Sequence, residues 1–207
     1  MVQAGLEVVR RHGVGGLTMR RVADHLGTGP MSLYRHVADK QELLVLMLDE
    51  VAAGCPPPPP HPDPVTRLVQ SWLVVHDYLG DQSWVVEVLS AGEIFAPRAL
   101  RLLDIVAATM TQAGFTPDET IQAYHAIWHL VLGSLANRRA WQPEVRAKRL
   151  ALLASIPLDD LPDAARLLGQ IGDREILPDV EGHLRALVEG ILRTSPADRK
   201  ARLQQIH

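Results

Sequence analysis

The sequence predicts an all-α protein made of a small N-terminal helical unit and a larger helical unit behind it. Three observations predict this fold class. Apolar residues recur three and four positions apart along most of the chain, which places them on one face of a helix. Capping residues and glycines delimit short helices before residue 54. Five consecutive prolines, Pro56 to Pro60, exclude a helix and separate the two units.

Composition narrows the class of protein. The 207 residues are 47% hydrophobic and 22% charged, which is enough to bury a core. The single cysteine, Cys55, excludes an internal disulfide and a metal site built on paired thiolates. The first eleven residues lack the apolar stretch of a secretory signal, and the segment Ile127 to Ala136 is shorter than the roughly 20 residues that span a bilayer. We therefore expect a cytoplasmic protein with no membrane partner.

Charge is distributed unevenly along the chain. The formal net charge of −3 argues against a protein that coats nucleic acid nonspecifically. Residues 10–40 nevertheless carry only two acidic residues against six basic ones, namely Arg10, Arg11, Arg20, Arg21, Arg35 and Lys40. This local excess of positive charge favours an interaction with phosphate groups.

The first two helices are predicted by spacing and by caps. Val2, Leu6 and Val9 recur at helical spacing, and Gly13 closes a helix that runs from Val2 to Arg11. The next helix opens at Thr18, whose hydroxyl can accept from free backbone amides, and ends at Gly27. We expect its buried residues to be Met19, Val22, Ala23 and Leu26.

The third and fourth helices follow after a short turn. Pro30 suits a first helical position, and a helix from Pro30 to Val37 turns Leu33 and Val37 inward. Asp39 then caps a fourth helix that ends near Ala53 or Gly54. Its inward residues are expected to be Leu43, Leu44, Met47, Leu48 and Val51.

Two short helices joined by a glycine-containing turn are typical of a helix-turn-helix, whose second helix enters the major groove of DNA. That helix here is Pro30 to Val37. Arg35 is the strongest candidate for contact with a base edge, together with Ser32 and His36. Phosphate contacts are expected from Thr18, Arg20, Arg21, Tyr34 and Lys40, and Thr28, Pro30 and Met31 complete the predicted DNA-facing set.

These residues resemble the DNA-binding domain of the TetR family of repressors. The resemblance is carried by the run Leu17 to Gly27, by the string Leu33-Tyr34-Arg35-His36-Val37, and by the run Asp39 to Leu44, which includes Lys40. It implies a helical dimer that binds its operator without ligand and leaves it when a small molecule occupies the second domain. It also implies that Thr18, Tyr34, His36 and Lys40 contact the DNA backbone or orient the recognition helix.

We expect residues 1–54 to form the DNA-binding domain, 55–64 a proline-rich linker, and 65–207 a ligand-binding and dimerisation domain. The linker is interpreted as a stiff connector, with a role as a proline-motif ligand as the alternative. Asp63-Pro64 opens a helix, a second runs from Ser83 to Ala91, and a third begins at Pro97 and stops at Gly114. The third helix is expected to bury Leu100, Leu103, Val106, Ala107 and Met110.

A long helix is predicted from Thr116, which forms a capping box with Glu119, towards Trp141. It is apolar on nearly all sides between Ile121 and Leu135, so it must be buried on more than one face. A C-terminal helix from about Asp179 to Arg193 has a similar pattern. Either ordinary core packing or a homodimer interface explains these helices, and the family resemblance implies a four-helix interface between subunits.

A small-molecule site should be concave and largely apolar, with a few polar groups that orient the ligand. His76, His125 and His129 could together hold a metal ion. Histidines on apolar helices are more often core residues, so we expect no metal or cofactor. The ligand-binding candidates are Trp72, His76, Trp84, Phe95, Met110, Tyr124, His125, Trp128 and His129.

The sequence therefore predicts a DNA-binding transcriptional regulator, a repressor released from a palindromic operator by a small apolar or aromatic ligand. Two alternatives stay open. One is a DNA-binding dimer without an effector. The other is an all-helical, metal-dependent enzyme that uses the three histidines. The enzyme is disfavoured because the sequence contains no paired nucleophile and base, no glycine-rich phosphate loop and no His-Glu-x-x-His string.

Overall fold

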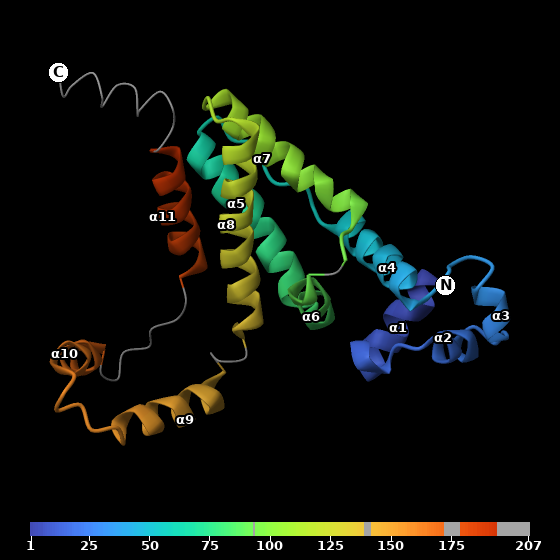
Figure 1. Ribbon diagram of the computed structural model, residues 1–207, viewed down its shortest axis with the longest axis horizontal. Coiled ribbons are helices and arrows are strands. Elements are labelled where there is room, and N and C mark those ends of the chain that lie inside the picture. Colours follow the sequence, from blue (N-terminus) through green and yellow to red (C-terminus); the bar gives the residue numbers. More distant parts are fainter. Residues whose placement is uncertain (93, 139–141, 172–178, 194–207) are drawn as a thin grey trace.

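The computed structural model describes residues 1–92, 94–138, 142–171 and 179–193. Within these ranges the chain is helical and contains no strand, which confirms the expected fold class (Figure 1). None of the helices in the described part of the chain is long and apolar enough to cross a membrane.

Four helices form the N-terminal unit at one end of the molecule (Figure 1). They are α1 (Val2–His12), α2 (Met19–His25), α3 (Pro30–Leu33) and α4 (Lys40–Gly54), with the 3-10 turn η1 (Val14–Gly16) between α1 and α2. Helix α1 packs on α2 and α4. A Cβ atom on Gly5 would lie 2.7 Å from Met47 Sδ, so glycine permits the close approach of α1 to α4. The buried core of this unit includes Val8, Leu17, Val22, Leu33, Val37, Leu43 and Met47.

The predicted helix ends of this unit are largely present. Thr18 Oγ1 accepts from the Arg21 amide at 3.2 Å, and Asp39 Oδ1 accepts from the Glu42 amide at 2.8 Å. Gly13 and Gly27 adopt left-handed φ angles of 68° and 66°, where glycine is favoured.

Two expectations in this unit are wrong. The third helix ends at Leu33 and not at Val37, because the chain tightens into a turn in which the His36 amide donates to the Leu33 carbonyl at 2.8 Å. Leu33 and Val37 are nevertheless both buried, as expected. Leu26 is 42% exposed, since it follows the last residue of α2 and the chain turns away at Gly27.

The larger unit is built around α5 (Pro64–Gly80), which packs against α6 (Ser83–Ala91), α7 (Leu100–Gln112), α8 (Pro117–Ala136) and α11 (Val180–Leu192). The capping box at Thr116 and Glu119 is present. Leu100 was expected to be buried but is 49% exposed, because it only begins α7 after the 3-10 turn η2 (Pro97–Ala99). The core of this unit includes Leu68, Trp72, Val106, Met110, Ile127, Val131, Leu184 and Val188.

Two further helices, α9 (Pro143–Ala154) and α10 (Pro162–Ile171), lie apart from this body (Figure 1). The helix predicted to run towards Trp141 ends at Ala136, and Trp141 itself lies outside the described residues. The last part of the predicted domain, residues 194–207, also lies outside them. Both helices carry exposed leucines, namely Leu150, Leu152, Leu153 and Leu167.

Candidate functional site

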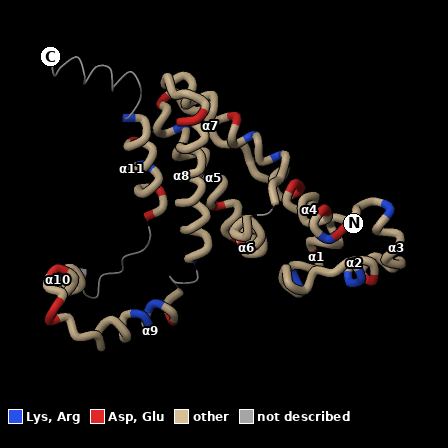
Figure 2. Tube along the Cα trace, in the orientation of Figure 1, with Lys and Arg blue, Asp and Glu red and all other residues tan. Residues whose placement is uncertain are grey.

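The first candidate site is the outer surface of α2 and α3. These helices contact each other across the turn that contains Gly27 and Gly29. Lys and Arg positions recur over α1, α2 and the neighbourhood of α3 (Figure 2). The structure places eight predicted DNA-facing residues in exposed positions and three in half-buried ones. The exposed set is Thr18, Arg20, Arg21, Pro30, Met31, Tyr34, Arg35 and His36, and the half-buried set is Ser32, Thr28 and Lys40.

Some of these side chains are already engaged within the protein. Arg21 Nη1 donates to the Gly16 carbonyl at 2.7 Å, and Lys40 Nζ donates to the Val14 carbonyl at 3.4 Å. Both bonds hold η1 against the unit. The side chains of Arg20 and Arg35, in contrast, make no hydrogen bond or ion pair with another residue that the structure describes. These two guanidinium groups are therefore free to meet an external acceptor.

The second candidate site is a cavity of about 820 Å³ inside the larger unit. Its wall combines the end of α4, the start of the proline linker, α5, the end of α6, the segment before α7, and the first turns of α7 and α8. Most of the lining side chains are aliphatic or aromatic. Such a volume and such a lining suit a small organic molecule.

The structure brings four of the nine predicted ligand residues to this cavity, namely Phe95, Tyr124, His125 and Trp128. Trp72 and Met110 are fully buried in the core and do not line it. His129 is exposed, one turn beyond His125, and does not line it either. The His76 side chain is 13% exposed, with Nδ1 2.9 Å from Asp77 Oδ1, and it too does not line the cavity.

Trp72 forms the floor beneath the aromatic part of the wall. Its ring centroid lies 5.2 Å from that of Tyr124 and 6.2 Å from that of Trp128. Its Nε1 is buried and has no hydrogen-bond partner among the residues that the structure describes. Burial raises the pKa of the Tyr124 hydroxyl above its ordinary value, which keeps that group protonated as a donor.

Sequence reasoning missed two parts of the wall. Pro56, Pro57 and Pro58 line the cavity, although the linker was expected to act only as a connector. Arg98, in η2, and Arg101, at the start of α7, line it as well. The sequence carried no local signal for either part, because both reach the cavity only through the packing of α4 and α7 around α5.

Two sets of contacts join the cavity wall to α4. Tyr78 Oη, on α5, donates to the Val51 carbonyl at 3.0 Å. The Arg98 amide donates to Asp49 Oδ1 at 2.7 Å, and Arg98 Nε lies 3.2 Å from Asp49 Oδ2. Since α4 also packs on α1, these contacts connect the wall of the cavity with the N-terminal unit.

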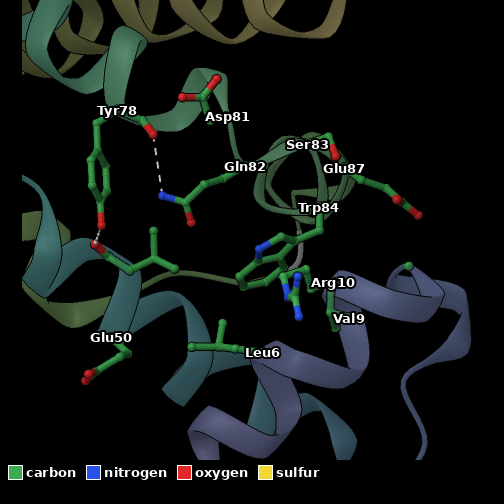
Figure 3. A pocket seen from close by; sticks show the side chains of 12 residues that line it. Leu6, Val9, Arg10, Glu50, Tyr78, Asp81, Gln82, Ser83, Trp84 and Glu87 are labelled. Atoms are coloured by element: carbon green, nitrogen blue, oxygen red, sulfur yellow. Dashed lines mark hydrogen bonds between the residues drawn. The ribbon is translucent and has the colours of Figure 1, made fainter.

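A smaller cavity of about 640 Å³ lies between the two units (Figure 3). Trp84, a predicted ligand residue, points from α6 towards Leu6 and Arg10 of α1 and lines this cavity in place of the larger one. Gln82 Nε2 donates to the Tyr78 carbonyl at 3.4 Å beside it. Trp84 therefore contributes to the junction between the units.

The histidines do not assemble into a metal site in the described part of the chain. No group of three or more His, Cys, Asp or Glu side chains there is arranged to hold a metal ion. The rings of His125 and His129 stack with centroids 6.2 Å apart on the outer face of α8.

Comparison with known proteins agrees with this architecture. The family model for bacterial regulatory proteins of the tetR family matches residues 2–47. The transcriptional repressor DrrR1 of Streptomyces coeruleorubidus is 31% identical over 156 residues, which are 72% of this chain and 55% of that protein. A helix-turn-helix transcriptional regulator of Saccharopolyspora erythraea is also 31% identical over 156 residues, which are 74% of this chain and 66% of that protein. The chain thus spans between half and two thirds of the length of these two relatives.

Solved structures share the fold. The TetR regulator SCO7222 of Streptomyces coelicolor superposes with a TM-score of 0.75 at 22% identity, covering 94% of this chain and 96% of that one. The Streptomyces coelicolor protein ActR, solved in complex with actinorhodin, gives a TM-score of 0.77 at 21% identity with the same coverage. At this level of identity the likeness concerns the fold.

Proposed function

The chain belongs to the TetR family of bacterial regulatory proteins, and from this premise we propose that it is a transcriptional repressor controlled by a small ligand. The repressor binds operator DNA through α2 and α3 and leaves it when the ligand occupies the 820 Å³ cavity. One observation carries the proposal. Helix α4 joins an exposed helix-turn-helix to the wall of a hollow, largely apolar body.

The DNA-binding step rests on the free side chains of α3 and its flanking turn. Arg35 is exposed and makes no pair within the described residues, so its guanidinium can donate two hydrogen bonds to the acceptor edge of a guanine. Arg20 and Tyr34 are exposed on the same unit and suit contact with phosphates. Thr18 and Lys40 support the fold of the N-terminal unit, and they lie at its edge, where they are available to the DNA backbone.

We propose that the protein acts as a homodimer through the outer faces of α8 and α11, which contact each other. A Cβ atom on Gly133 or Gly190 would meet nothing within 4 Å, so small residues leave open space on these helices. Open, small-residue faces allow two helices to approach closely. Two recognition helices about 34 Å apart then read a palindromic site.

Release from DNA follows as a population shift. A ligand that binds one arrangement of the cavity wall more tightly favours that arrangement. The wall acts on α4 through the Arg98–Asp49 pair and the Tyr78–Val51 hydrogen bond. A coupling of about 1 to 3 kcal/mol changes operator affinity roughly 5- to 150-fold. ActR was solved with actinorhodin, and by analogy we propose a small organic ligand here.

Selection from a pool of random duplexes, followed by titration of the enriched sequence, tests the DNA-binding step. We expect wild-type protein to prefer one palindromic duplex, and Arg35→Ala to lose roughly 5- to 150-fold in affinity for it, because a bidentate base contact contributes about 1 to 3 kcal/mol. Arg166→Ala serves as the control, since it removes an exposed arginine from α10, which lies apart from the N-terminal unit (Figure 1). Failure of the wild-type protein to select any duplex contradicts the proposal.

A DNA-binding dimer without an effector remains the second candidate. It is favoured if no compound that enters the cavity changes affinity for the selected duplex. The family also points away from an enzyme, and a cytoplasmic location stays a prediction from the sequence.

A further inference from the structure

The larger cavity carries charge of one sign. Among the described residues that line it, Arg98 and Arg101 are cationic and none is Asp or Glu. The smaller cavity between the units is the opposite, because Glu50, Asp81 and Glu87 line it beside Arg10. The two cavities therefore differ in the charge of the side chains that line them.

The two arginines of the larger cavity are not equivalent. Arg98 is engaged with Asp49 at 3.2 Å and Glu50 at 3.7 Å. Arg101 is exposed, and its side chain makes no hydrogen bond or ion pair with another described residue. It stands in the first turn of α7, which contains no acidic residue. Arg101 is thus the unsatisfied cation of the cavity.

The rest of the wall demands an apolar ligand body. Phe95, Tyr124 and Trp128 offer aromatic surface, and Pro56 to Pro58 offer no backbone N–H donors. A charge placed among these side chains would lose its hydration without gaining a partner. A ligand can place an anionic group on Arg101 and its apolar body inside the cavity without that cost.

We propose that the larger cavity binds an amphipathic organic anion, with its apolar body among Phe95, Tyr124 and Trp128 and its anionic group on Arg101. This inference rests on the proposed function, since it names the ligand class of the same cavity. The experiment therefore measures whether Arg101 discriminates between a charged and a neutral ligand.

A matched pair of probes isolates the charge. Pyrene-1-butyric acid and pyrene-1-butanol share the same apolar body and differ in the carboxylate. Each is titrated into the full chain, with quenching of tryptophan fluorescence and calorimetry as readouts. We expect the acid to bind at least about 10-fold more tightly than the alcohol, because charge-assisted hydrogen bonds are stronger than neutral ones. Raising the salt concentration should shrink that ratio.

Two variants assign the discrimination to one side chain. Arg101→Gln should bring the affinity for the acid down to that for the alcohol while leaving the alcohol unchanged. Arg166→Gln makes the same change of charge on α10, away from the cavity, and should keep the wild-type ratio. Far-ultraviolet circular dichroism of both variants checks that they fold.

The outcomes separate this inference from the proposed function. Equal binding of acid and alcohol by the wild type, or an unchanged ratio in Arg101→Gln, overturns the anionic ligand but leaves a regulator with a neutral apolar ligand. Binding of neither probe by a protein that still selects a duplex overturns the inference and leaves DNA recognition standing. Loss of duplex selection by the wild type concerns the proposed function alone.

Discussion

The N-terminal unit carries its candidate functional side chains on its outer surface, whereas the larger unit carries them around an internal cavity. In the N-terminal unit the core is closed by residues such as Val22, Leu43 and Met47, and the candidate contacts stand outside it. In the larger unit the candidate contacts surround a cavity of about 820 Å³, supported by the buried Trp72. We therefore expect most exposed side chains of the first unit, apart from helix caps such as Thr18, to contribute little to its stability, whereas the second unit depends on the few buried side chains that support its cavity.

The largest expected effect tests that dependence at Trp72. Trp72→Ala should lower the free energy of unfolding by about 3 to 5 kcal/mol, because it removes a fully buried aromatic side chain between α5 and α8. Denaturant unfolding followed by circular dichroism measures the loss. Met31→Ala, at a side chain that is 76% exposed, should change stability by no more than about 0.5 kcal/mol. Similar losses for both variants would contradict the comparison.

The next effect concerns the start of α2. Thr18→Ala should cost about 1 kcal/mol of unfolding free energy, because it removes the hydroxyl that accepts from the Arg21 amide at 3.2 Å. Thermal or urea unfolding gives the value. Thr18→Ser keeps the acceptor and should retain most of the stability. If serine and alanine destabilise equally, the cap is not the reason for threonine at this position.

A smaller effect is expected where the two regions are joined. A double-mutant cycle of Arg98→Gln and Asp49→Asn should give a coupling of about 0.5 to 1 kcal/mol, since the pair is partly exposed, with 49% and 18% of the two side chains accessible. Chemical unfolding of the four proteins gives the coupling. Additive effects would show that this pair does not link the cavity wall to α4.

The smallest effect lies on α1. Arg10 and then Arg11 hold the pKa of the Glu7 carboxyl at about 2, well below its ordinary value of 4.5. The folded-state pKa is lowered, so this contribution to stability is complete above about pH 4.5 and is lost as the pH falls towards 2. Carboxyl NMR titration should locate the transition near pH 2 in dilute salt. A midpoint near 4.5 would contradict the pairing, and Glu7→Gln should flatten this part of the pH profile.

Local signals made the N-terminal unit predictable. The caps at Thr18 and Asp39 and the turn at Gly27 act over three or four residues, so the sequence alone locates them. Leu26 and the end of α3 were mispredicted because they depend on how the chain leaves a helix. The same limit explains Leu100, which periodicity placed inside a helix that it only begins.

The sequence predicted an apolar, aromatic cavity, but it did not predict which residues line it. Residue type led to Phe95, Tyr124 and Trp128, which line it, and also to Trp84, which faces α1. Nothing local distinguishes these tryptophans, because the direction of α6 relative to α1 is set by tertiary packing. Arg101 was overlooked for the same reason, since its neighbours in space come from distant segments.

The polyproline stretch gives the cavity an unusual kind of wall. Pro56, Pro57 and Pro58 follow Cys55, the residue after the end of α4, and line the cavity. Each has a ring-locked φ and no N–H, so this stretch resists bending inward around a guest. A ligand too large for the cavity must instead displace the segment Pro56 to Pro58 as a whole, together with the end of α4, the helix that follows the helix-turn-helix. The same three proline rings thereby influence both the fit of a ligand in the cavity and the orientation of the helix-turn-helix at the other end of the molecule.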